Sequence, residues 1–131
     1  MSLIAYQQAS KRAETPSSTE YRLFAQVTRA LMDAQAGSSD SFSEIAEAVD
    51  WNRRVWGAMA VDCAQAENGL PESLRAGIIS LSMFISRHST IVVRDIEEMD
   101  ILIDLNKTIM QGLADQQRML ASRTVAEAKS A

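Results

Sequence analysis

Few side chains in this chain of 131 residues could carry out catalysis or bind a metal ion. It has a single histidine, His88, and a single cysteine, Cys63. A zinc site needs a cluster of Cys and His ligands, and a serine or cysteine nucleophile needs a base beside it. The acidic stretch Glu97 to Asp100 lacks the spacing of a calcium-binding loop, and the chain has no glycine-rich phosphate loop and no dinucleotide fingerprint. We therefore predict that the protein is not an enzyme and holds neither a metal nor a cofactor.

The most unusual side chains gather in the stretch DWNRRVW, from Asp50 to Trp56. It contains both tryptophans of the chain, an asparagine and two arginines. On a helix that turns about 100° per residue, Trp56 and Asn52 lie on the face that would pack against other helices. We predict that Trp56 is a core residue. We also predict that Asn52 is buried and hydrogen-bonded to a neighbouring helix, which would fix the register of the two helices.

Trp51 belongs to a different side of the same helix. It lies roughly 120° from the packing face, with Val55 beside it. Either the first predicted helix or the C-terminal segment covers Trp51, or it is an exposed anchor of the kind enriched at interface hot spots. Arg53 and Arg54 point to the flank and away from the packing face, where adjacent arginines are more often solvated or ion-paired than functional. This side of the stretch is therefore available to a partner, whereas the Trp56 side builds the core.

The composition is that of an ordinary soluble protein, with 47% hydrophobic and 23% charged residues. Its formal net charge of −4 disfavours direct binding to nucleic acid, which needs an excess of Lys and Arg. One cysteine excludes an internal disulfide, which agrees with a reducing cytoplasm. The longest apolar run, Ile78 to Ile85, is too short to cross a bilayer, and the first residues show no secretion-signal pattern. We expect a cytoplasmic protein without membrane insertion.

Hydrophobic spacing predicts an all-α fold, a single-domain helical bundle of about five helices. The bundle is expected to cover residues 1–120, and the small polar tail 121–131 is expected to fray. The first helix, Leu3 to Ala13, should end before Pro16, because the residue preceding a proline avoids helical backbone angles. The expected starts of the other helices are the capping patterns at 17–20 and 41–44, Pro71, and a position near Asp95.

Four of these helices carry an apolar face whose residues alternate in steps of three and four, as helices that pack together do. The residues expected to face inward are Phe24, Val27, Leu31 and Ala34; Ile45, Val49, Asn52, Trp56, Met59 and Cys63; Leu74, Ile78, Leu81, Ile85, His88 and Val92; and Leu102, Leu105, Ile109 and Leu113. Because His88 falls on such a face, we expect it to be a hydrogen-bonded core residue rather than a ligand or a base.

The fourth predicted helix is apolar on more than one side. Ile79 and Met83 lie opposite its packing face. Either this helix is central and surrounded by the others, or it presents a second apolar face to another molecule. The serines that keep this second face narrow are Ser80, Ser82 and Ser86.

The order and content of several sequence blocks resemble the FlaF family of flagellar biosynthesis regulators. These blocks are AYQQA (5–9), EYRLFAQVTRAL (20–31), DWNRRVW (50–56), LPESLRAGIISLSMFISRHS (70–89) and LIDLNKTIMQGL (102–113). The resemblance implies a small cytoplasmic helical protein that is needed for flagellin synthesis and export. It also implies association with flagellin as a secretion chaperone, and action alongside FlbT, a regulator that restrains flagellin translation. It implies no enzyme activity, and it offers no catalytic or ligand-binding residues.

A chaperone for flagellin would need an apolar groove that accepts a helix, because the resemblance implies that flagellin's terminal segments are disordered before assembly and become coiled-coil helices in the filament. The residues predicted to form this groove are Trp51, Val55, Ile79, Met83 and Met110, with Arg53, Arg54 and Arg87 at its rim.

Two other functions are compatible with the sequence. A regulatory adaptor would act through FlbT or flagellin mRNA, and a basic patch at Arg53, Arg54 and Arg87 would then make binding strongly salt-dependent. The negative net charge makes a protein–protein adaptor the better version of that hypothesis. A structural bundle that dimerises through its fourth helix is the third hypothesis.

Overall fold

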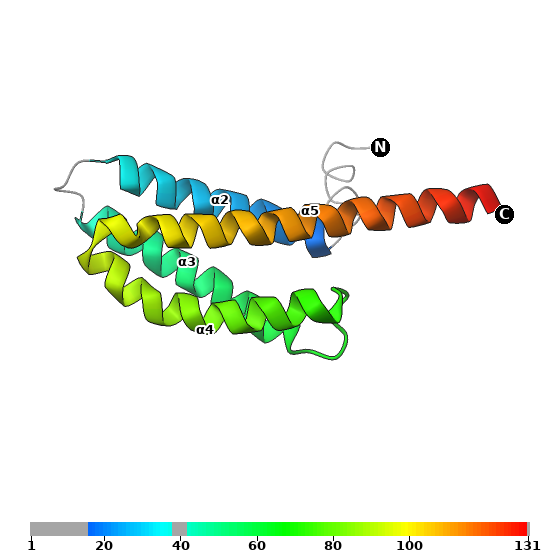
Figure 1. Cartoon of the computed structure of the whole chain (residues 1–131), viewed down its shortest axis with the longest axis horizontal. Coiled ribbons are helices and arrows are strands. Elements are labelled where there is room, and N and C mark those ends of the chain that lie inside the picture. The colour runs from blue at the N-terminus through cyan, green and yellow to red at the C-terminus, as the bar shows by residue number, and fades with distance from the viewer. Residues whose placement is uncertain (1–15, 38–41, 131) are drawn as a thin grey trace, which may run out of the picture.

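The computed structural model describes residues 16–37 and 42–130 (Figure 1). Within these ranges the chain forms four α-helices and one short 3-10 helix, and no strand. The elements are α2 (Pro16–Ala36), α3 (Phe42–Cys63), α4 (Glu72–Arg94), η1 (Ile96–Glu98) and α5 (Met99–Ser130). The predicted all-α class is confirmed. The predicted count of five helices is not, since four are described and the predicted helix Leu3 to Ala13 lies outside the described residues.

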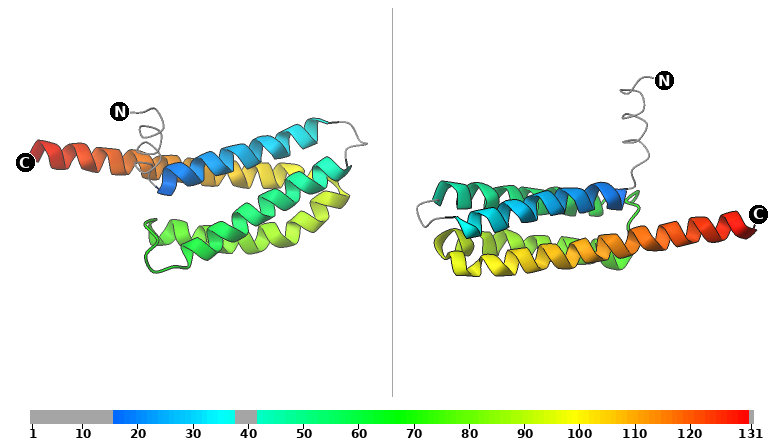
Figure 2. Two further views of the ribbon diagram at one scale, coloured as in Figure 1. Left: turned by 180° about the vertical axis from the view of Figure 1, so that it is seen from behind. Right: turned by 90° about the horizontal axis from the view of Figure 1, so that it is seen from above.

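The helix boundaries differ from the prediction at two places. Pro16 was expected to separate two helices, but α2 begins at Pro16, where a proline fits because the first helical residues need no backbone N–H donor. The chain after Leu120 was expected to fray, but α5 continues as a helix to Ser130. Residues 121–130 are exposed, and this end of α5 extends beyond the other helices (Figures 1 and 2).

The helices are arranged so that α2 contacts both α3 and α5, while α4 packs chiefly on α3. The turn between α3 and α4 is held by Arg75, whose Nε donates to the backbone oxygen of Cys63 at 2.8 Å. The turn between α4 and α5 is ordered by Asp95, whose side chain accepts from the backbone N–H of Glu97 at 3.1 Å. Contact between α4 and α5 is slight, so α4 lies at the edge of the bundle.

The core consists of the inward faces predicted from the spacing, and most of those residues are buried. The predicted residues that are buried are Phe24, Val27, Leu31, Ala34, Val49, Asn52, Trp56, Met59, Cys63, Ile78, Ile85, Val92, Leu102, Ile109 and Leu113. Those only partly buried are Ile45, Leu74, Leu81, His88 and Leu105. The ring of Phe24 meets Trp56 edge to face, with 5.1 Å between the ring centroids.

A buried polar network connects three helices through Asn106 of α5. Asn106 Oδ1 accepts from the indole N–H of Trp56 at 2.8 Å. Its Nδ2 donates to Asn52 Oδ1 at 2.8 Å and to Thr28 Oγ1 at 3.0 Å. Asn52 and Asn106 are fully buried. The prediction that Asn52 is a buried, interhelical hydrogen-bonding residue is confirmed, and so is the core position of Trp56.

The outer side of α4 is apolar and exposed. Met83 is 63% exposed, Ile91 48% and Phe84 37%. The first alternative, a central helix surrounded by the others, is therefore wrong for the described residues. Of the predicted second face, Met83 is exposed and Ile79 is partly buried against the core. By length and composition alone, the 23-residue α4 could cross a membrane, although the run Ile78 to Ile85 is too short to do so. Core helices of soluble proteins share this length and composition, so these two properties do not by themselves indicate a membrane span.

Candidate functional site

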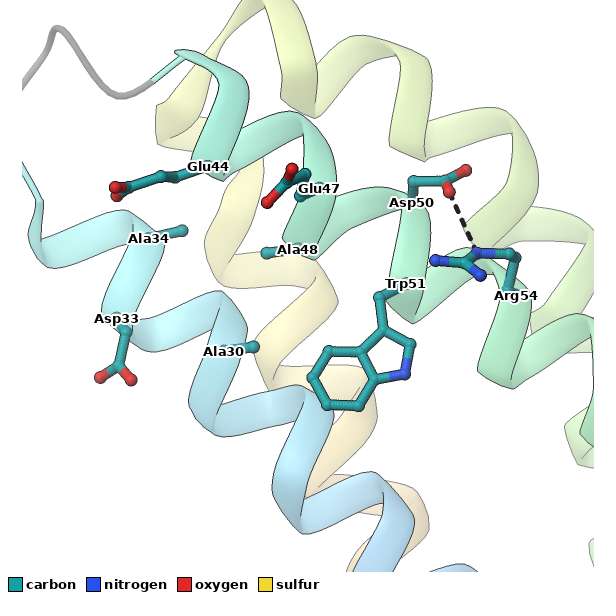
Figure 3. A pocket seen from close by; sticks show the side chains of 9 residues that line it. All are labelled: Ala30, Asp33, Ala34, Glu44, Glu47, Ala48, Asp50, Trp51 and Arg54. Carbon is teal, nitrogen blue, oxygen red and sulfur yellow. Dashed lines mark ion pairs between the residues drawn. The ribbon is translucent and has the colours of Figure 1, made fainter.

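A groove of about 730 Å³ runs between α2 and α3 (Figure 3). Small side chains leave this space open, because Ala30 and Ala34 of α2 and Ala48 of α3 lie where the two helices face each other. The groove residues are Ala30, Asp33, Ala34, Glu44, Glu47, Ala48, Asp50, Trp51 and Arg54. We refer to this feature as the α2–α3 groove.

Trp51 provides the large apolar surface of the α2–α3 groove. Its indole projects from α3 toward α2, near Ala30 (Figure 3). The side chain is partly buried and packs against the core, yet it still lines the open groove. Its indole N–H forms no hydrogen bond with the described part of the chain. Trp51 therefore has one part packed on the core and another part accessible from the groove, a position suited to an aromatic contact with a bound partner.

The charges around the groove are mostly negative. Asp33 lies on the α2 side, and Glu44 and Glu47 lie on the α3 side (Figure 3). None of these three carboxylates forms an ion pair with another described residue. The only cationic side chain that lines the groove is Arg54, among the residues that the structure describes.

Arg54 and Arg53 are both held by Asp50. Asp50 Oδ1 accepts from Arg53 Nη2 at 2.7 Å, and Asp50 Oδ2 lies 3.0 Å from Arg54 Nε. The hydrogen bond from Arg53 lowers the pKa of the Asp50 carboxyl, and the positive charges of both arginines act in the same direction. Since all three side chains are largely solvated, this cluster orients the arginines more than it stabilises the fold. It also compensates part of the positive charge that a nucleic acid would need.

The structure separates the residues that were predicted to form one partner-binding groove. Trp51 and Arg54 line the α2–α3 groove, and Arg53 lies beside it on α3. Val55 is only 5% exposed, so its predicted place in an exposed patch is wrong and it belongs to the core. The reason is that Val55 falls beside the packing face of α3 and is part of the buried core cluster.

The other predicted residues lie on different surfaces. Met110 of α5 lines a second groove of about 460 Å³, between α2 and α5. Its sulfur lies 3.9 Å from Thr28 Oγ1. Ile79, Met83 and Arg87 belong to α4, and none of them lines the α2–α3 groove. Ile79 is partly buried, while Met83 and Arg87 are exposed.

The acidic residues of the groove were missed by the sequence reasoning. Glu44, Glu47 and Trp51 are spaced by three and four residues, which places them along one side of a helix. This spacing could have indicated a shared surface, but the capping pattern at 41–44 accounts for Glu44 without one. Asp33 could not have been added, because it joins this surface only through the packing of α2 on α3.

Two buried acidic groups, the carboxyl of Glu20 in α2 and the thiol of Cys63 in α3, interact electrostatically at the C-terminal end of α3. Glu20 is 7% exposed, and its Oε2 has no hydrogen-bond partner among the described residues. Burial raises the pKa of Glu20 to about 7, and the negative charge of Asp62 adds to this rise. Burial also raises the pKa of the Cys63 thiol to about 11, with further contributions from Glu20 and Asp62. A thiol with so high a pKa is a poor nucleophile at neutral pH.

His88 lies at the margin of the core rather than inside it. Its ring stacks on Phe84, with 5.1 Å between the centroids. Nε2 lies 3.4 Å from Glu98 Oε2 but forms no hydrogen bond, so the expected hydrogen-bonded core histidine is not observed. Along α4, His88 is 13 residues from Arg75, which contacts Cys63, and this corresponds to about 20 Å of helix. His88 is therefore too far from Cys63 to act as its base.

Comparisons with known proteins identify a family for this chain. Residues 2–113 match the family model described as "Flagellar protein FlaF". Neither a curated protein nor a solved structure matches the chain. Within the described residues, no group of three or more His, Cys, Asp or Glu side chains could hold a metal ion.

Proposed function

Because the match spans most of its length, the chain belongs to the FlaF family of flagellar proteins, and we propose that it is a cytoplasmic chaperone that binds flagellin before export. The client region would be a terminal segment of flagellin that becomes helical when it binds. The observation that carries this proposal is the α2–α3 groove, an open space between two helices that is lined by the partly buried ring of Trp51.

The shape of the groove supports a helical client. Ala30, Ala34 and Ala48 allow another backbone to approach closely, and Trp51 offers a rigid aromatic surface. A segment that folds on binding spends part of its interaction free energy on becoming ordered, so its affinity is modest for the area that it buries. Modest affinity suits a chaperone that must release its client for export.

A regulatory adaptor is the second candidate function, and the exposed face of α4 favours it. Met83, Phe84 and Ile91 lie on this face, away from the α2–α3 groove. A chain with two separate apolar surfaces can contact flagellin with one and a regulator such as FlbT with the other. Direct action on mRNA has less support, because the acidic groove repels phosphate groups and Arg53 and Arg54 are already paired with Asp50.

Calorimetry of the full chain against purified flagellin tests the chaperone proposal. Flagellin would be used at full length and with either terminal segment removed. We expect binding that requires one terminal segment and has a negative heat-capacity change, since apolar surface is buried. Absence of binding to full-length flagellin would refute the chaperone proposal, and the same titration with FlbT would then test the adaptor.

The place of binding can be read from the two tryptophans. If the chain is prepared with 5-fluorotryptophan, Trp51 and Trp56 give two fluorine resonances. We expect flagellin to shift the Trp51 resonance, because that ring lines the groove, and to leave Trp56 unchanged, because it is fully buried. A flagellin complex in which the Trp51 resonance does not move would place the client on another surface. Met83 and Met119 are exposed positions outside the groove, so the variants Met83→Ala and Met119→Ala should leave the flagellin-induced shift of the Trp51 resonance unchanged.

A further inference from the structure

We propose that the α2–α3 groove selects a helical segment that carries Lys or Arg side chains along its flanks. This inference rests on the proposed function, because it takes the occupant to be a helix of a partner protein. It goes further by assigning the charge of that helix and the residues that recognise it.

The carboxylates stand on both sides of the groove. Asp33 is contributed by α2, while Glu44 and Glu47 are contributed by α3 (Figure 3). A helix that docks over Trp51 therefore passes between negative charges on its two flanks. Each carboxylate lacks an ion-pair partner among the described residues, so each is free to receive one from the occupant.

The arrangement also disfavours other occupants. An acidic segment would bring like charges within a screening length of about 8 Å, which opposes binding. A nucleic acid would meet the same repulsion from its phosphates. Arg54 does not reverse this balance, because its guanidinium is ion-paired with Asp50, whose Oδ2 lies 3.0 Å from Nε (Figure 3).

Trp51 favours the same chemistry. The face of an indole attracts a cation that lies against it, and Arg and Lys are the side chains that use this contact. Because Trp51 lies beside the acidic residues, one basic side chain of the occupant can contact the ring and a carboxylate together. Apolar contact and charge therefore point to a single class of partner, a basic amphipathic helix.

The direct test uses two synthetic peptides with the same Leu and Ala face, one with Lys and the other with Glu at its polar positions. A length of about 18 residues gives five helical turns. Binding to the full chain is followed by the Trp51 fluorine resonance. We expect the Lys peptide to bind at least about tenfold more tightly than the Glu peptide at low salt, and this ratio to fall at about 0.3 M salt.

Charge-reversed variants test whether the groove carboxylates cause the preference for the Lys peptide. Glu44→Lys combined with Glu47→Lys should remove the preference for the Lys peptide. The matched control is Glu67→Lys combined with Asp104→Lys, which changes the net charge equally at exposed positions outside the groove and should keep the preference. Flagellin is tested with the same two variants, and we expect only the groove variant to weaken its binding.

The outcomes separate this inference from the proposed function. Equal binding of the two peptides, or binding of neither, would overturn the basic-helix inference whatever flagellin does. A control variant that loses the preference as fully as the groove variant would also overturn it, because the effect would then come from net charge. If flagellin binds the groove variant as tightly as the unmodified chain, the inference that the groove selects a basic helix is overturned. The proposal that the chain binds flagellin as a chaperone is not contradicted by that result.

Discussion

Trp56 of α3 and Asn106 of α5, which are 50 positions apart in sequence, are joined by a buried hydrogen bond of 2.8 Å from the indole N–H to Oδ1. Asn106 also donates to Asn52 and Thr28, so one side chain connects α5 with α3 and α2. Three hydrogen bonds are made in the native alignment of the helices, although the Nδ2 of Asn52 is buried without a partner among the described residues. Sliding one helix along another would break several of these bonds, and the network therefore selects one register.

Replacement of Asn106 by leucine should destabilise the protein strongly. The change leaves the Trp56 N–H and the Asn52 Oδ1 buried without their partners. A loss of about 3 to 5 kcal/mol in the free energy of unfolding is expected, from several unpaired groups at about 1 to 3 kcal/mol each. Urea denaturation measures it, with Lys107→Ala on the exposed side of α5 as the control. A loss below about 1 kcal/mol would show that the network does not hold the helices in register.

The two tryptophans should respond differently to truncation. Trp56 is fully buried and packs on Phe24, so Trp56→Ala should cost about 3 to 5 kcal/mol. Trp51 is only partly buried, so Trp51→Ala should cost about 1 to 2 kcal/mol while reducing the affinity for flagellin by about tenfold or more. Thermal unfolding and calorimetry on the same preparations measure the two effects. A Trp51 variant that is as unstable as the Trp56 variant would identify Trp51 as a structural residue only.

Glu20 should make the stability of the fold depend on pH. Its pKa is about 7 in the folded chain and 4.5 in the reference state, so folding favours the protonated carboxyl. The benefit of protonation is fully present below about pH 4.5 and is lost as the pH rises to about 7, where the folded chain must bury a charge.

The variant Glu20→Gln removes that dependence. We expect it to be more stable than the unmodified chain at pH 8 by about 1 to 3 kcal/mol, and to show little difference at about pH 4. Urea denaturation between these pH values gives the comparison, and Glu67→Gln at an exposed position is the control. If the Glu20→Gln variant differs from the unmodified chain by the same amount at every pH, a raised pKa is excluded as the cause.

Two glycines within helices offer a matched pair of substitutions. A Cβ on Gly57 of α3 would meet nothing within 4 Å, so Gly57→Ala should stabilise the fold by about 0.5 to 1 kcal/mol through helix propensity. A Cβ on Gly112 of α5 would lie 3.3 Å from Leu74 Cδ1, which links α5 to α4. Gly112→Ala should therefore gain less, because Leu74 must shift. Thermal midpoints of the two variants test this order, and a larger gain at Gly112 would contradict it.

Most of the residues that face inward along each helix are predictable from the spacing of apolar side chains. Phe24, Trp56, Ile85 and Leu113 each belong to a different helix, and each is one of a series of inward residues whose spacing repeats with the turn of that helix. This local relationship holds whatever the helices pack against. The same reasoning identified Asn52 as a buried polar residue. It could not identify Asn106 as its partner, because the pairing depends on how α5 lies beside α3.

Which exposed residues of different helices lie on the same surface depends on the packing of the helices, and the sequence does not give it. Trp51, Met83 and Met110 were assigned to one groove from the sequence, but they lie on α3, α4 and α5 and border different surfaces. Helical periodicity gives the direction of a side chain around its own axis, but not the order of helices around the bundle. That order depends on contacts between residues far apart in sequence. It placed α2 beside α3, and so brought Asp33 opposite Glu44 and Glu47 across the groove.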